Sequence, residues 1–175
     1  MIRLRPLRSL ALLALAAAPV GVGVVVVAAS PADAGESEVC KLVTRKEASD
    51  LLGAKVVKTT TKTSTTNGAE ECTYRTKKKG FRNLKLQLEL TIQPVTDELR
   101  SKLQNIPFED GSRLQDLGDE AYVDKFDSVV ALSGATAVQG KLQNYQGASS
   151  RFRSVSEGVV RAAIPRLGEI TPPTR

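Results

Sequence analysis

The side chains best suited to chemistry in this chain of 175 residues are two cysteines, Cys40 and Cys72. The sequence contains no histidine. Imidazole is the usual general base near neutral pH and the commonest metal ligand, so its absence excludes Ser-His-Asp catalysis, Cys-His catalysis and histidine metal sites. Catalysis by carboxylates, lysine or tyrosine stays open. No catalytic motif is present, and we expect no catalytic residues, no metal site and no cofactor.

The first 34 residues have the three-part pattern of a secretory signal peptide. Residues 1–8 contain three arginines and no acid, residues 10–29 are an apolar run, and Ala32-Asp33-Ala34 is a small-x-small site. Cleavage is therefore expected between Ala34 and Gly35, giving a secreted, extracytoplasmic protein. The apolar run is also long enough to cross a bilayer, so tethering by an uncleaved N-terminal segment is the alternative. Pro19 and the glycines after it weaken that alternative.

Export changes the meaning of the cysteine pair. An even number of cysteines in an exported domain is typical of a disulfide. A Cys40–Cys72 bridge would close a loop that stabilises the fold by roughly 3–4 kcal/mol. The alternative, a reactive or redox thiol pair, lacks the C-x-x-C spacing.

The remaining 141 residues have the length of one domain. We expect a short N-terminal segment at 35–39, a single α+β domain at 40–168, and a Pro-containing tail at 169–175. The whole chain has 25 basic and 19 acidic side chains, and removal of residues 1–34 leaves 22 and 18. The resulting charge of +4 favours weak attraction to anionic surfaces, and it does not indicate a nucleic-acid partner.

Hydrophobic periodicity predicts an antiparallel sheet of about six strands with three packing helices. In residues 84–92, Leu and Ile alternate with polar residues, which is typical of a strand with one face on the core and one in water. A ligand could lie across that polar face. Capping residues predict helices that begin at Thr44, Thr96 and Ser154. The other expected strands are residues 55–60, 72–76, 117–122, 129–132 and 135–138.

A Thr-rich run at residues 59–68 ends in an Asn-Gly pair. It is expected to be an exposed loop or a frayed edge strand, with O-glycosylation as the functional alternative.

Basic side chains gather around a predicted hairpin tip. A solvated tip that discourages edge pairing explains them. The functional hypothesis is docking to anionic lipid or wall polymer through the four residues of the tip itself. The cluster comprises Arg75, Lys77, Lys78, Lys79, Arg82 and Lys85, and the four tip residues are Lys77, Lys78, Lys79 and Arg82.

Two further patterns are weaker. Gly134, Gly140 and Lys141 resemble a phosphate-binding loop only superficially, because the spacing is wrong and Leu142 replaces the Ser/Thr. The second pattern is an acidic stretch without calcium-loop spacing, which is expected to be a solvated loop. Paired-carboxylate hydrolysis is the alternative there. The stretch consists of Asp116, Asp119, Glu120, Asp124 and Asp127.

Four short landmarks resemble an actinobacterial family of exported proteins of unknown function. They are Cys40-Lys41-Leu42-Val43-Thr44, a helix end at Leu51-Leu52-Gly53, Cys72-Thr73-Tyr74 and Leu117-Gly118-Asp119-Glu120-Ala121-Tyr122, and the resemblance covers about residues 40–167. It implies an envelope location, a Cys–Cys bridge and an α+β domain similar to the PsbP/Mog1-like sandwich, and it brings no catalytic residues. Many relatives carry a lipid-attachment cysteine. Here Glu36 and Glu38 precede Cys40, which favours release over anchoring.

The sequence therefore predicts a secreted, envelope-associated binding module without catalysis, whose partner is a protein, lipid or glycan. Two alternatives are a carboxylate-dependent hydrolase of envelope polymers and a structural or antigenic surface protein.

The cleavage site makes a direct prediction. Mass spectrometry of secreted protein should find an N-terminus at Gly35 or an adjacent residue, because Ala32-Asp33-Ala34 supplies the small side chains that precede a signal-peptide cut. Retention of residues 1–34 would favour the tethered form instead.

Overall fold

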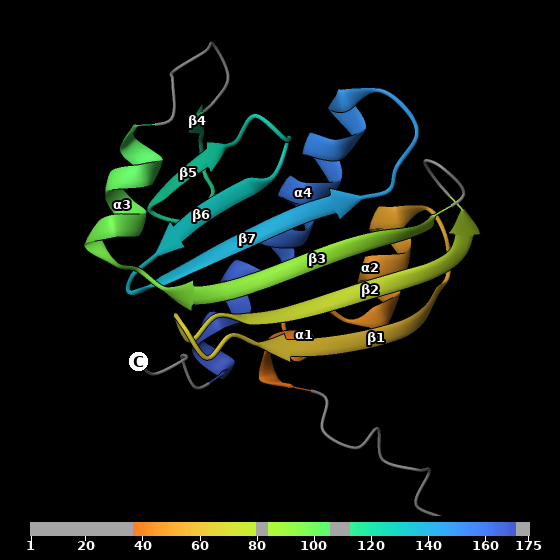
Figure 1. Cartoon of the computed structure of the whole chain (residues 1–175), viewed down its shortest axis with the longest axis horizontal. Helices are drawn as coiled ribbons and strands as arrows, with labels where there is room; N and C mark the ends of the chain where they lie inside the picture. The colour runs from red at the N-terminus through yellow and green to blue at the C-terminus, as the bar shows by residue number, and fades with distance from the viewer. Residues whose placement is uncertain (1–36, 80–83, 106–112, 171–175) are drawn as a thin grey trace, which may run out of the picture. The chain divides into compact units, whose positions relative to one another are not determined.

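The computed structural model describes residues 37–79, 84–105 and 113–170, and in this part of the chain seven strands form one antiparallel sheet (Figure 1). The strand order is β1-β2-β3-β7-β6-β5-β4. The predicted signal peptide, its predicted cut between Ala34 and Gly35, and Arg82 lie outside the described residues. The strands are β1 Val56–Thr63, β2 Glu70–Lys79, β3 Lys85–Pro94, β4 Arg113–Leu114, β5 Glu120–Val123, β6 Val129–Ser133 and β7 Thr136–Gln143.

The predicted α+β class is confirmed, with more elements than expected in the described ranges. The helices are α1 Glu38–Lys41, α2 Arg45–Leu52, α3 Asp97–Gln104, α4 Ser149–Ala163 and the 3-10 helix η2 Ile164–Glu169. Two of the additional elements, α1 and β4, have only four and two residues. They are too short for hydrophobic periodicity to reveal.

The sheet consists of two antiparallel meanders that meet at their last strands. β1, β2 and β3 follow one another and lead into α3, whereas β4 to β7 follow one another and lead into α4. β3 and β7 join them in a continuous register from Gln87↔Gln143 to Pro94↔Thr136. Through the pairing of β3 with β7, the two meanders form one continuous sheet.

One face of the sheet carries the main core. The alternation predicted for β3 buries Leu86, Leu88, Leu90 and Ile92 on this face. Leu84 was expected to join them but is 50% exposed, because the strand begins one residue later at Lys85. In the view of Figure 1, α2 and α4 lie behind the sheet and cover this face.

Helix α4 approaches the sheet most closely at Gly140 of β7. A Cβ atom built at this position would lie 2.3 Å from the backbone oxygen of Ser156 and 2.4 Å from Val159 Cγ1. Both distances are shorter than atoms can tolerate, so only glycine lets the helix backbone rest on β7. This packing, rather than phosphate binding, explains the glycine that formed part of the apparent loop motif.

The opposite face is covered over β5, β6 and β7 alone. Leu103 of α3 packs there against Tyr122, Val130 and Leu132, with Leu99 beside it. Arg100 also forms a 3.0 Å ion pair with Glu120 of β5. Thus α3 lies on the side of the sheet away from α4.

The N-terminal segment is fastened beneath β2. The predicted Cys40–Cys72 disulfide is present. The buried hydroxyl of Tyr74 donates a 2.5 Å hydrogen bond to the Val43 carbonyl oxygen. Val39 is buried in the core, so the folded domain begins before residue 40.

The predicted Thr44–Glu47 capping box opens α2. Glu47 also accepts two hydrogen bonds from the Arg166 guanidinium, at 2.6 and 2.8 Å. These bonds lower the pKa of Glu47 to about 2, so the carboxylate stays ionised at physiological pH. The pair joins α2 to η2 near the C-terminus.

Two C-terminal expectations were wrong in detail. Helix α4 begins at Ser149, five residues before the expected start, and Glu157 pairs with Arg161 instead of capping the helix at Ser154. Beyond Pro165 the chain continues as η2, and Ile170, assigned to the tail, is buried in the core. In both places tertiary packing extends the ordered structure beyond the residues at which capping or proline signals predicted its limits.

The disulfide indicates an oxidising, extracytoplasmic environment. Among the described residues, no helix has the length and apolarity needed to cross a membrane.

Replacement of Gly140 by alanine should destabilise the domain by about 3 kcal/mol, the upper part of the range for overpacking, because the new methyl would collide with the α4 backbone. Gly168→Ala is the matched control, since its Cβ would meet no atom within 4 Å and should change stability by less than about 0.5 kcal/mol. Urea unfolding measures both. Equal effects would contradict the proposed close contact.

Candidate functional site: the open face of the sheet and its groove

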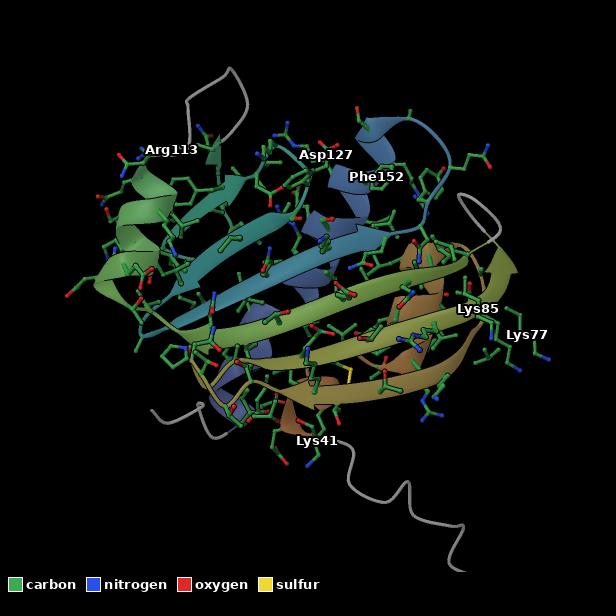
Figure 2. All side chains as sticks on the ribbon, viewed as in Figure 1. Lys41, Lys77, Lys85, Arg113, Asp127 and Phe152 are labelled. Atoms are coloured by element: carbon green, nitrogen blue, oxygen red, sulfur yellow. A yellow bond between two sulfur atoms is a disulfide. The ribbon has the colours of Figure 1, made fainter. Side chains whose placement is uncertain are left out.

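The polar side chains of β1, β2, β3 and β7 form a surface that we call the open face. No helix of the described ranges lies over it, and its side chains project from the front of the sheet in Figure 2. Strand register arranges the residues in three rows. The rows are Lys58–Arg75–Gln87–Gln143, Thr60–Thr73–Glu89–Lys141 and Lys62–Glu71–Thr91–Gln139.

Glu89 lies at the centre of the open face. It is half-buried, and it accepts a 2.5 Å hydrogen bond from Gln143. Burial, followed by the nearby charge of Glu71, raises its pKa, while the Gln143 bond, Lys141 and Arg75 act in the opposite direction. The centre of the open face is therefore a carboxyl group whose partial burial disfavours its charged form. Both an acidic neighbour, Glu71, and basic neighbours, Lys141 and Arg75, act on it.

Neighbouring side chains on the open face are bonded to one another. Arg75 Nε donates to the Gln87 side-chain oxygen at 3.0 Å, and the Thr73 hydroxyl donates to Glu71 at 2.9 Å. Both bonds link residues on one face of the sheet. They orient charged and amide groups outward before any ligand arrives.

A polar groove adjoins one end of the open face. It has a volume of about 780 Å³ and lies between the β1–β2 turn and α3. Asn67 of the turn bonds Gln93 of β3 at 3.3 Å across its floor. Hydroxyl and amide groups supply much of the wall. The lining residues include Thr63, Ser64, Thr65, Thr66, Asn67, Gln93, Thr96, Glu98 and Lys102.

A second hollow, of about 420 Å³, lies between α2 and α4. Its carboxylates are Glu47 and Asp50. Glu47 is bound to Arg166, and Asp50 forms a 2.9 Å ion pair with Lys46. These contacts give both groups structural partners, so this hollow is the weaker candidate.

The predicted acidic stretch is dispersed around β5, where its members hold turns. Asp119 accepts a 2.7 Å hydrogen bond from the Gly134 backbone, and Asp124 accepts bonds from the Phe126 and Ser128 amides. Glu120 pairs with Arg100. Asp116 and Asp127 adopt positive φ angles of 57° and 56°, and the side chain of Asp127 is among those drawn in Figure 2. The arrangement supports turn formation, as expected of a surface loop.

The predicted basic tip is described in part. Lys77, Lys78 and Lys79 end β2, and Lys79 pairs in register with Lys85 at the start of β3. Lys77 and Lys85 are exposed and extend beyond the end of the sheet in Figure 2. Lys77 therefore lies two residues beyond Arg75 of the first row, on the same strand.

The landmarks of the family resemblance have structural roles. Gly118 has a φ of 67°, and a Cβ there would lie 2.3 Å from the Leu132 carbonyl oxygen. Cys40, Cys72 and Tyr74 fasten the N-terminal segment, as described above. The landmark residues therefore stabilise the fold. Thr73 is the one landmark residue that lies on the open face.

Sequence reasoning identified the polar face of β3 as a place where a ligand could lie. It did not find the contribution of β7, whose Lys141 and Gln143 flank Glu89. The only available signal was the alternation of residues 139–143, which an apparent phosphate-loop motif overlapped.

No family model, curated protein or solved structure matches this chain.

The raised pKa of Glu89 predicts a pH-dependent stability difference. A folded-state pKa above the unfolded value means that wild-type stability falls as pH rises from about 4.5 through the folded pKa. Glu89→Gln lacks the titrating carboxyl group. Its free energy of unfolding should therefore rise relative to that of wild type between pH 4 and 7, by less than about 1 kcal/mol. Denaturant unfolding at several pH values measures the difference.

Glu98→Gln is the matched control, because Lys102 lowers the pKa of Glu98. That carboxylate stabilises the folded state above its unfolded pKa. The free energy of unfolding of Glu98→Gln should therefore fall relative to that of wild type over the same pH interval. A difference for Glu89→Gln that does not grow with pH would contradict the buried position of its charge.

Proposed function

We propose that this chain is a secreted, envelope-associated binding domain without catalysis, and that its open face binds an acidic glycan or wall polymer. The observation that supports this most is a broad polar sheet face left without a helix. The other half of the same side of the sheet is covered by α3. A side chain such as Glu89, kept partly buried at a cost, is typical of a functional surface.

The charges of the open face favour an anionic ligand. The three rows contain four basic side chains and two acidic ones. The exposed side chains of Lys77 and Lys85, near the ends of β2 and β3, add positive charge beyond the first row. Hydroxyl and amide groups of the groove add donors and acceptors suited to a polymer that carries many hydroxyls.

Secretion fits this proposal. A signal peptide places the protein where envelope polymers are found, and the disulfide agrees with that compartment. The family resemblance, with its envelope location, supports the same assignment.

A second candidate is hydrolysis by Glu71 and Glu89. The two residues are diagonal neighbours on adjacent strands, whose backbone positions lie about 7–8 Å apart, a spacing that is compatible with the carboxyl separation of about 6.5–9.5 Å in inverting glycosidases. The raised pKa of Glu89 suits a general acid. However, neither carboxylate lines the groove, and hydrolytic sites are concave. Binding is therefore the preferred proposal.

Charge reversal on the open face should separate specific binding from general attraction. The double variant Arg75→Glu/Lys141→Glu should weaken binding to alginate, a polyuronate, by at least about tenfold, because it removes two cations beside Glu89. Isothermal titration calorimetry at fixed ionic strength provides the affinities, with neutral dextran as the uncharged polymer.

The matched control is Lys46→Glu/Lys125→Glu, which changes the net charge equally at residues outside the open face. Its affinity should fall by less than about threefold. Equal losses in the two variants would contradict the proposed face, and preference for anionic phospholipid vesicles would redirect it to lipid. Release of reducing ends by wild type but not by Glu89→Gln would establish hydrolysis.

A further inference from the structure

The two edges of the sheet differ strongly. β4 ends the sheet with two residues, whereas β1 ends it with eight. From Lys58 to Thr63, β1 pairs with β2 without interruption, after an irregularity that leaves Val57 exposed. The outer edge of β1 therefore presents a straight row of backbone amides and carbonyls that pair with no other strand of the described chain.

The side chains of β1 suit the addition of another strand. Thr59, Thr60, Thr61 and Thr63 are β-branched and small, and such residues favour extended structure. On the core side, Arg45 of α2 donates a 3.1 Å hydrogen bond to the Thr59 hydroxyl. This bond holds the centre of the strand in place, while no other described strand pairs with its outer edge.

The charged side chains of β1 are all lysines, and of these Lys58 lies opposite a cation whereas Lys62 lies opposite Glu71. Residues 51–69 contain three lysines and no acidic residue. Lys58 lies opposite Arg75, so two cations share the start of the first row. Arg75 is bonded to an amide, and no carboxylate of the described chain forms an ion pair with Lys58. A carboxylate on an added strand would complete that row.

We propose that the free edge of β1 is a docking strand for an extended peptide segment of a partner protein, with two acidic side chains four residues apart. Backbone hydrogen bonds to β1 would supply the affinity, as in other cases of strand addition. Lys58 and Lys62 lie on the same face, four residues apart, so an Asp/Glu-x-x-x-Asp/Glu segment places a carboxylate beside each. The backbone edge of β1 is distinct from the open face, although Lys58 and Lys62 also belong to the rows of that face.

The lysines also select against other strands. A second copy of the chain, paired antiparallel about Thr60, would place Lys58 against Lys62 of the other copy. Like charges directly opposite one another are destabilising. The edge thus disfavours self-association and basic peptides while it accepts an acidic strand, which is specificity through repulsion.

The probe is the fluorescein-labelled peptide Thr-Val-Glu-Val-Thr-Val-Glu-Val-Thr, with a second peptide carrying lysine at both glutamate positions. Fluorescence anisotropy should show saturable binding of the glutamate peptide and at least about tenfold weaker binding of the lysine peptide. Lys58→Glu/Lys62→Glu should reverse this preference. Lys46→Glu/Lys125→Glu, the charge-matched control, should keep it.

Amide hydrogen exchange tests the geometry. Bound glutamate peptide should protect alternate backbone amides within residues 56–63, because every second amide of an edge strand faces outward. Absence of saturable binding at millimolar peptide, protection located elsewhere, or an unchanged preference in Lys58→Glu/Lys62→Glu would overturn the proposal. Dimerisation of the protein through β1 would overturn it as well. Lys141→Glu, on a strand three positions away from β1, should retain the peptide while it weakens alginate binding, so failure of one proposal is distinguishable from failure of the other.

Discussion

The attachment of the N-terminal segment to β2 is the constraint on which the rest of the structure depends. Cys72 and Tyr74 lie two residues apart on the core face of β2, where one forms the disulfide to Cys40 and the other donates to the Val43 carbonyl. Together they place α1 and α2 over the first meander, whose apolar face would otherwise meet water. The Glu47–Arg166 pair then connects this segment to η2, so both ends of the domain are secured on one side of the sheet. Because α1, α2 and η2 all lie on that side of the sheet, none of them covers the open face.

The two halves of the outward side show contrasting solutions for a sheet surface. Over β5, β6 and β7 the side chains are apolar, and α3 removes them from water. Over β1, β2, β3 and β7 they carry charges, amides or hydroxyls, and several of them bond to one another, as Arg75 does to Gln87. Packing Glu89 into such a network costs more than a threonine would at the same position, since burial disfavours its charge. A surface that needed only solubility would not require this group.

Much of the fold was predictable because its determinants are local. The alternation of β3, the capping box at Thr44 and the cysteine pair each depend on a few neighbouring residues, and each prediction was confirmed. The start of α4 and the position of Ile170 depend on tertiary packing, which moves element boundaries beyond their local signals. The candidate site was only partly predictable. The polar face of β3 was visible in the sequence, but its combination with β7 follows from a pairing that joins residues about 50 positions apart, such as Glu89 and Lys141.

The close contact at Gly140 has a consequence for recognition. Gln139 and Lys141 project from the open face on either side of this glycine, while the strand behind them rests on the backbone of α4. A ligand that contacts these two side chains therefore meets a rigid surface, because the close packing of α4 behind β7 leaves the strand no space to move. Such a surface is preorganised: it binds with little rearrangement of its backbone and loses little conformational entropy in doing so. Selectivity would then come from shape and charge fixed during folding, and ligands that require the protein to adapt would be rejected.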